Sequence, residues 1–131
     1  MLLLLCSYFN LSGKTNVPLA PCIMLVLFVT ESGDHEEISI VNLFGTFYFC
    51  RECAQIMMEK GYGRIVNTAS VVGLNGHTMH SEYAASKGAV ISLTKAMAKD
   101  IGKFGVTVNS VSPGMIPTKN ATNGNLNHTN F

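Results

Sequence analysis

The sequence predicts an α/β fold in which parallel strands are joined by long helices, and three observations lead to this. Residues 63–70, "GRIVNTAS", and 105–112, "GVTVNSVS", are short, start at a glycine and are rich in β-branched residues. Between them, residues 81–102 repeat apolar side chains at helical spacing. A strand, a helix and a strand in this order form a βαβ unit. Strands at 64–69 and 106–111 should therefore be parallel, either adjacent or one apart, with a right-handed connection.

A second long helix is predicted before the first of these strands. Residues 34–59 run without a proline from Asp34, which suits a helix N-cap, through two glutamates to the stop "GYG". Its centre, "IVNLFGTFYFC", is apolar nearly all round, so it should be buried against the sheet and against a further surface such as a partner subunit. The helix at 82–101 should pack on the same side of the sheet. Its predicted apolar stripe consists of Ala89, Leu93, Met97 and Ile101.

The two ends of the chain differ from this middle. Residues 1–33 are apolar and contain no clear repeat of the βαβ unit, although Ile23 to Val29 predict a buried strand. The apolar run "VPLAPCIMLVLFV" has 13 residues and two prolines, which is too short for the roughly 20 residues of a membrane-crossing helix. Residues 119–131 form an asparagine-rich polar tail with too little apolar surface to order itself.

Composition excludes several classes of function. With 131 residues, 47% hydrophobic and 13% charged, the chain is one domain or part of one and is too apolar to be disordered. A net charge of +1 gives no basic stripe for a nucleic acid. The four cysteines lack the spacing of a secreted disulfide framework, and "CREC" lies inside a helical pattern. We therefore expect reduced thiols packed as small hydrophobes, a cytoplasmic location, and neither a nucleic-acid nor a membrane partner.

The stretch "YAASK" carries the chemistry. Tyr83 and Lys87 are four residues apart in a helix, so both side chains leave one helix face and can reach the same small volume. An ammonium near a phenol favours the phenolate and lowers a pKa that is otherwise about 10, as a general acid or base requires. Ser70 ends the first strand and Pro113-Gly114 follow the second. Because ligands of open α/β sheets bind beyond the carboxyl ends of parallel strands, these residues predict one site at one edge.

Two longer stretches resemble a known family. "VNLFGTFYFCRECAQIMMEKGYGRIVNTASVVG" and "YAASKGAVISLTKAMAKDIGKFGVTVNSVSPGMIPT" are similar, in this order, to the C-terminal half of the core of the short-chain dehydrogenase/reductase family. The resemblance covers about residues 38–118 and includes the Y-x-x-x-K pair, a serine 13 residues before the tyrosine, the asparagine of "VNL" and the "PGMIPT" segment. It is greatest to the 3-oxoacyl-carrier-protein reductase group and its sugar and alcohol dehydrogenase relatives.

The resemblance implies a role for each matching residue in NAD(P)-dependent hydride transfer between nicotinamide and a carbonyl or secondary alcohol. Tyr83 exchanges the proton with the substrate oxygen. Lys87 lowers the pKa of Tyr83 and bonds the nicotinamide ribose. Ser70 hydrogen-bonds the substrate oxygen, and Asn42 holds a water in a proton relay to Lys87 at a slight irregularity of the long helix.

On the cofactor side the resemblance implies contacts at the nicotinamide end. Ile116 and Thr118 contact the carboxamide, and Pro113 and Gly114 shape the turn. The cofactor is NAD or NADP, and nothing in the sequence selects between them. Family members resembling this chain pair their long helices into dimers and tetramers, which predicts a homo-oligomer through helices 34–59 and 82–101.

The chain also departs from the family pattern. The glycine-rich turn T-G-x-x-x-G-x-G and the N-N-A-G run are both absent from it, so the expected fold is a partial Rossmann-like, doubly wound parallel sheet lacking the N-terminal glycine-rich βαβ half. We expect residues 1–33 to be non-matching, 34–118 to be a partial catalytic core, and the whole to be a truncated copy. The alternative is a non-catalytic remnant that at most pairs through its helices with an intact relative.

Other interpretations of single motifs are weaker. "LSGKT" at 11–15 ends like a phosphate-binding loop, but Pro18 and Pro21 would break the helix that must follow. His77 and His80 could bind a metal, yet no carboxylate or cysteine stands at a supporting spacing, so we expect no metal and a loop that lines a substrate pocket. Asn42, taken alone, equally fits a buried helix asparagine with no role in a proton relay.

Overall fold

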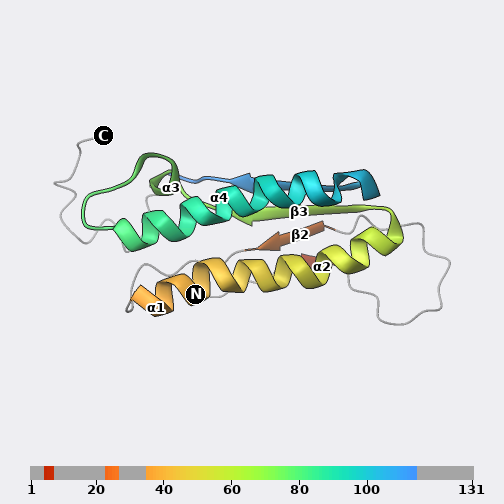
Figure 1. Cartoon of the computed structure of the whole chain (residues 1–131), viewed down its shortest axis with the longest axis horizontal. Helices are drawn as coiled ribbons and strands as arrows, with labels where there is room; N and C mark the ends of the chain where they lie inside the picture. The colour runs from red at the N-terminus through yellow and green to blue at the C-terminus, as the bar shows by residue number, and fades with distance from the viewer. Residues whose placement is uncertain (1–4, 8–22, 27–34, 115–131) are drawn as a thin grey trace.

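The computed structural model describes residues 5–7, 23–26 and 35–114. Four strands form one sheet in the order β1-β2-β3-β4 (Figure 1). Strands β2, β3 and β4 are mutually parallel, and β1 pairs antiparallel with β2. The prediction of parallel, adjacent strands after residue 60 is therefore confirmed. The four strands are β1 Leu5–Ser7, β2 Ile23–Val26, β3 Gly63–Thr68 and β4 Val106–Val111.

The long helix before β3 forms as predicted, with one irregular turn inside it. It begins as α1, His35–Ser39, continues as the π-helix η1, Ile40–Gly45, and ends as α2, Thr46–Lys60. Gly61, with φ 66°, ends it in the left-handed conformation that glycine adopts without steric cost. The π-turn is the irregularity expected around Asn42. The predicted N-cap, Asp34, lies outside the described residues.

The crossover from β3 to β4 contains two helices. The single-turn helix α3, Val72–Asn75, precedes the long helix α4, Ser81–Ile101, and the short 3₁₀ turn η2, Gly102–Phe104, leads into β4. In Figure 1, α4 runs lengthwise along β3 and β4. Helix α4 matches the predicted 82–101 within one residue.

The buried face of α4 differs from the predicted stripe. Ile101 is buried as expected, but Ala89 and Leu93 are only half-buried. Val90 and Thr94, each one position further along, occupy the centre of the buried face instead. The predicted stripe is correct at its C-terminal end, where Ile101 is buried and Met97 packs against the core. In its middle it is wrong by one residue, because the half-buried flank carries apolar side chains as well.

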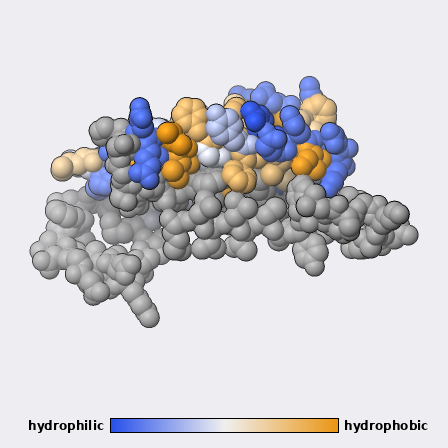
Figure 2. Space-filling model, turned by 90° about the horizontal axis from the view of Figure 1, so that it is seen from below, coloured by the Kyte–Doolittle hydropathy of each residue, from blue (hydrophilic) through white to orange (hydrophobic). Residues whose placement is uncertain are grey.

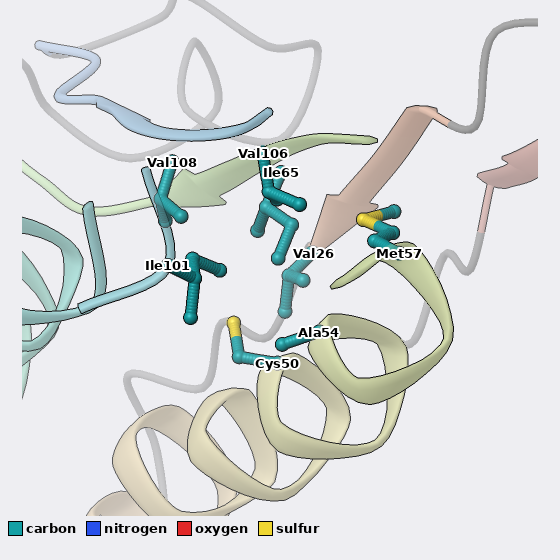
Figure 3. Close-up of a cluster of buried hydrophobic side chains, with 8 residues drawn as sticks. All are labelled: Val26, Cys50, Ala54, Met57, Ile65, Ile101, Val106 and Val108. Carbon is teal, nitrogen blue, oxygen red and sulfur yellow. The ribbon is translucent and has the colours of Figure 1, made fainter. Parts of the chain in front are cut away.

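The main core lies between one face of the sheet and both long helices. Figure 3 shows the side chains of α2 pointing up toward those of the strands, with Ile101 of α4 beside them. On the other face of β4, Thr107 and Asn109 are exposed, so the described helices cover the sheet from one side. The core cluster comprises Val26, Cys50, Ala54, Met57, Ile65, Ile101, Val106 and Val108.

Several expectations fall on residues that the structure does not describe. These are the possible phosphate loop at 11–15, the residues 27–29 of the predicted N-terminal strand, the tail, Ile116 and Thr118. Within the described part, β2 confirms a strand at 23–26, and Val26 is buried as predicted. Across that same part, every helix is too short or too polar to cross a membrane.

Candidate active site

Ser70 and Pro113 are brought together where β3 and β4 end. The ladder between β3 and β4 continues past both strands, since the amide of Ala69 donates to the carbonyl of Val111 at 2.8 Å and that of Val71 donates to Pro113 at 3.1 Å. Ser70 lies between these two bonds and is buried. Its Oγ accepts a hydrogen bond from the amide of Val72 at 3.2 Å, at the start of α3. The hydroxyl is thus fixed at the carboxyl edge of the sheet, as predicted.

Tyr83 and Lys87 lie on the buried face of α4, beside the same edge. Lys87 is 0% exposed, which is rare for a lysine because burying its charge is unfavourable. Its Nζ donates to the carbonyl oxygen of Thr68 at 3.0 Å, two residues before Ser70. The same Nζ is 5.9 Å from the centre of the Tyr83 ring, and Tyr83 is itself buried. The structure therefore brings Tyr83, Lys87 and the end of β3 into one region.

Two glycines let α3 approach α4 closely at this point. A Cβ at Gly73 would lie 2.7 Å from the amide nitrogen of Gly88 and 2.7 Å from the carbonyl carbon of Lys87. The backbone that follows Ser70 thus packs directly on the backbone of Lys87. Sequence reasoning missed Gly73; its only signal was a glycine three residues after Ser70, in a segment that could equally have been a loop.

Asn42 is tied to the same helix through Ser86. Its Nδ2 donates to the Oγ of Ser86 at 3.3 Å, and Ser86 donates in turn to the carbonyl of Tyr83 at 2.9 Å. The carbonyl of Asn42 accepts from the Oγ1 of Thr46 at 2.8 Å, one turn further along the irregular helix. Asn42 is fully buried, and its partner Ser86 directly precedes Lys87 on α4. This geometry is common to the two interpretations of Asn42, as a relay residue and as a packed asparagine.

A second set of polar side chains lies deeper in the core. Cys50 donates from Sγ to the Oδ1 of Asn67 at 3.1 Å, and the Nδ2 of Asn67 donates to the Oγ1 of Thr94 at 2.9 Å. Burial raises the pKa of the Cys50 thiol from 9.0 to about 11, against the opposing effect of the hydrogen bond with Asn67. Cys50 and Cys53 are both free thiols. Asn67 and Thr94 were not predicted from sequence.

The histidine loop precedes α4. The Nδ1 atoms of His77 and His80 are 3.2 Å apart, and each is 2.9 Å from the carbonyl oxygen of Thr78. Met79 between them has φ 61° and is almost wholly exposed. Over residues 35–114 and the two described N-terminal strands, no three histidine, cysteine or carboxylate side chains gather as metal ligands do.

The donor set at the edge suits the ribose and nicotinamide end of a dinucleotide. It consists of a lysine ammonium, a tyrosine hydroxyl and a serine hydroxyl on two elements that meet at the carboxyl ends of parallel strands. These groups can donate to a hydroxyl or carbonyl oxygen and can exchange a proton with it. For the pyrophosphate, the sequence offers no T-G-x-x-x-G-x-G turn.

A parallel sheet with a buried lysine and a tyrosine at its carboxyl edge defines the chain as a partial Rossmann-like α/β protein. Its residues 27–129 match the family described as short chain dehydrogenase, and the chain belongs to this family of oxidoreductases. The match extends beyond residues 38–118, on which the resemblance was based. Family members with bound NAD or NADP are known among solved structures.

Three relatives illustrate the relationship. The 3-oxoacyl-[acyl-carrier-protein] reductase FabG of Vibrio cholerae serotype O1 is 44% identical over 93 residues, which are 71% of this chain and 38% of the reductase. NAD⁺-bound xylitol dehydrogenase has a TM-score of 0.63 and 38% identity, over 65% of this chain and 33% of that chain. ElxO with NADP bound has a TM-score of 0.73 and 26% identity, over 77% and 45%. The chain therefore spans less than half the length of each of these relatives.

Proposed function

We propose that this chain carries the substrate-orienting and proton-transfer part of an NAD(P)-dependent oxidoreductase that interconverts a carbonyl and a secondary alcohol. The observation that carries the proposal is the wholly buried Lys87, whose Nζ lies 5.9 Å from the centre of the Tyr83 ring and donates to Thr68 at the end of β3, two residues before Ser70. A buried ammonium is unfavourable, and buried titratable groups of this kind concentrate at functional sites. The substrate class is a 3-oxoacyl thioester, a sugar or another alcohol.

Each residue has a distinct part in the proposal. The cofactor supplies or accepts the hydride when bound. Tyr83 gives its phenolic proton to the carbonyl oxygen in reduction and takes it back in oxidation, while the positive charge of Lys87 stabilises the phenolate. Ser70 donates to the same oxygen and orients it. Asn42, through its position beside Ser86, connects this site to a water relay.

The cofactor-side assignments belong to the same proposal. Lys87 and Tyr83 bond the nicotinamide ribose, and the segment from Pro113 and Gly114 to Ile116 and Thr118 contacts the carboxamide. Support comes from Pro113, whose carbonyl oxygen accepts from Val71 next to Ser70. We also propose that residues 34–118 carry the catalytic part of the partial core, to whose sheet β2 adds a parallel strand, and that the chain acts in a reducing compartment such as the cytoplasm.

We further propose that the chain associates with a copy of itself through its two long helices. The long helix before β3 exposes five large aromatic or aliphatic side chains. On the face seen in Figure 2, hydrophobic residues drawn in orange lie between hydrophilic ones drawn in blue. Helix α4 contributes the half-buried Ala89 and Leu93, which the sheet does not cover fully. Patches of this kind mark interaction sites. The exposed set is Ile40, Phe44, Phe47, Tyr48 and Phe49.

A chimeric enzyme tests the proposed function. The segment of the Vibrio cholerae reductase that matches this chain is replaced by this chain's own residues, and reduction of a 3-oxoacyl thioester with NADH or NADPH is measured. The proposal predicts activity that Tyr83→Phe lowers by about 10² to 10⁴, the usual contribution of general acid catalysis. Tyr62→Phe is the matched control, since the Tyr62 ring packs against Arg64 away from the site. A folded chimera that loses nothing on Tyr83→Phe would refute the assignment and favour the non-catalytic alternative.

A further inference from the structure

A continuous chain of polar side chains joins three elements inside an otherwise apolar core. It runs from Cys50 on α2 to Asn67 on β3 and on to Thr94 on α4, with distances of 3.1 Å and 2.9 Å. All three residues are buried, Asn67 completely. In Figure 3, Cys50 points from α2 toward the sheet, as this contact requires. The reaction proposed above uses none of these groups.

The orientation of the Asn67 amide is fixed by its neighbours. The Thr94 hydroxyl donates to the carbonyl of Val90 at 2.8 Å, so its oxygen remains as an acceptor for the Nδ2 of Asn67. The Cys50 thiol is protonated at neutral pH and can only donate usefully to Oδ1. Each partner therefore accepts one orientation of the amide, and hydrogen bonds, unlike apolar contacts, are directional.

The contact between Asn67 and Thr94 lies at a similar distance from the candidate active site along β3 and along α4. Ser70 is three residues beyond Asn67, or about 10 Å along an extended chain. Lys87 is seven residues before Thr94, or about 10 Å along a helix. Helix α4 is antiparallel to β3. Ser70 and Lys87 therefore lie on the same side of the contact between Asn67 and Thr94 and at about the same distance from it. Any sliding of α4 at Thr94 would shift Lys87 and Tyr83 relative to Ser70 by the same amount.

We propose that Asn67 is a positioning residue that sets the height of α4 against β3 through Thr94, and thereby places Tyr83 and Lys87 relative to Ser70. The bond from Lys87 to the carbonyl of Thr68 alone does not fix this height, because the lysine stem is flexible. Catalytic groups must be held to within about 0.5 Å of their productive positions. The consequence for catalysis rests on the proposed function; the geometric claim does not.

Three substitutions in the full chain test the proposal. Thr94→Val keeps the shape and removes the acceptor, and Thr94→Ser keeps the hydroxyl. The pair Asn67→Leu with Thr94→Val makes the contact apolar, so that it removes the directional bond without leaving a buried amide unpaired. Interproton distances between α4 and β3, measured by NMR from nuclear Overhauser effects, give the height of α4 against β3, and ¹³C-labelled Tyr83 gives the pH midpoint at which its phenol ionises.

We expect Thr94→Ser to match the parent chain in both measurements. Thr94→Val and the apolar pair should change the interproton distances between α4 and β3 and should change the Tyr83 midpoint. Amide exchange from Tyr83 to Val90 should rise about tenfold in Thr94→Val. Unchanged distances and an unchanged midpoint in the apolar pair, if it is folded, would overturn the proposal and leave the polar chain a purely structural feature.

A fourth variant separates this proposal from the proposed function. If Lys87→Met leaves the Tyr83 midpoint unmoved, the acid–base pair assumed for catalysis is wrong, whereas the distances between α4 and β3 in the Thr94 variants still decide the role of Asn67. Cys50→Ala serves as a control on α2. It removes the donor to Oδ1 and leaves the bond to Thr94, so it should not displace α4 from β3.

Discussion

Gly73→Ala is expected to force α3 away from α4 beside the candidate active site. The added Cβ would stand 2.7 Å from two backbone atoms, the nitrogen of Gly88 and the carbonyl carbon of Lys87, where ordinary van der Waals contact begins at 3.4 Å. The two backbones must therefore separate by roughly 0.7 Å or more, because neither atom belongs to a side chain that can rotate away. Overpacking of this kind costs about 1 to 3 kcal/mol.

Urea unfolding followed by circular dichroism measures this effect. With a slope of about 1 to 3 kcal/mol per molar urea, the midpoint should fall by about 1 M. Gly102→Ala is the matched control, since the added Cβ would meet no atom within 4 Å beyond its own helical turn and its chain neighbours, and the φ of −57° at Gly102 suits alanine. That variant should be neutral or more stable by a few tenths of a kcal/mol. Equal midpoints for the two variants would refute the close approach of α3 to Lys87.

Three further predictions concern other parts of the chain. The pKa of the Cys50 thiol is about 11 in the folded chain and 9.0 ordinarily, so the unfolded thiol ionises first as the pH rises. The free energy of unfolding should therefore fall by about 2 to 3 kcal/mol between pH 9 and 11. Cys50→Ala should remove this loss of stability, and Cys53→Ala should keep it. The full chain should sediment as a dimer or larger at tens of micromolar, and Phe44→Glu with Phe47→Glu should give a monomer; a parent chain already monomeric would contradict the association proposal. Fluorescence titration of residues 1–131 with NADH and NADPH should show no saturable binding, since the sequence contains no T-G-x-x-x-G-x-G turn for the pyrophosphate; saturation at micromolar cofactor would show that another segment holds it.

Local patterns in the sequence predicted the elements and the residues at the edge. The βαβ unit, the limits of both long helices and the place of Ser70 at the end of the first strand followed from the apolar period, the glycines and the motif. The phase of the buried face of α4 did not, because apolar residues on the flank of a helix look the same in sequence as those facing the sheet. Thr94 was therefore not recognised as part of the core.

Contacts between distant residues account for the remaining differences. An asparagine within a strand pattern, such as Asn67, could face solvent or a polar partner, and only the packing of α2 and α4 decides between them. Similarly, a glycine at position 73 indicates only that the backbone there is permissive. The sequence does not show that the space beside Gly73 is taken by α4, whose backbone at Gly88 follows 15 residues later. The antiparallel pairing of β1 with β2 was not predicted, because neither segment carries a turn signal that links it to the other.

The ionisation of Tyr83 in the presence and absence of Lys87 tests most directly whether these two residues form an acid–base pair. The measurement follows the ¹³Cζ resonance of labelled Tyr83 against pH in the parent chain and in Lys87→Met, with Lys95→Met, an exposed lysine on the same helix, as control. The ammonium 5.9 Å from the ring centre should hold the parent midpoint below that of Lys87→Met, with Lys95→Met like the parent. Equal midpoints in the parent and in a folded Lys87→Met would contradict the account.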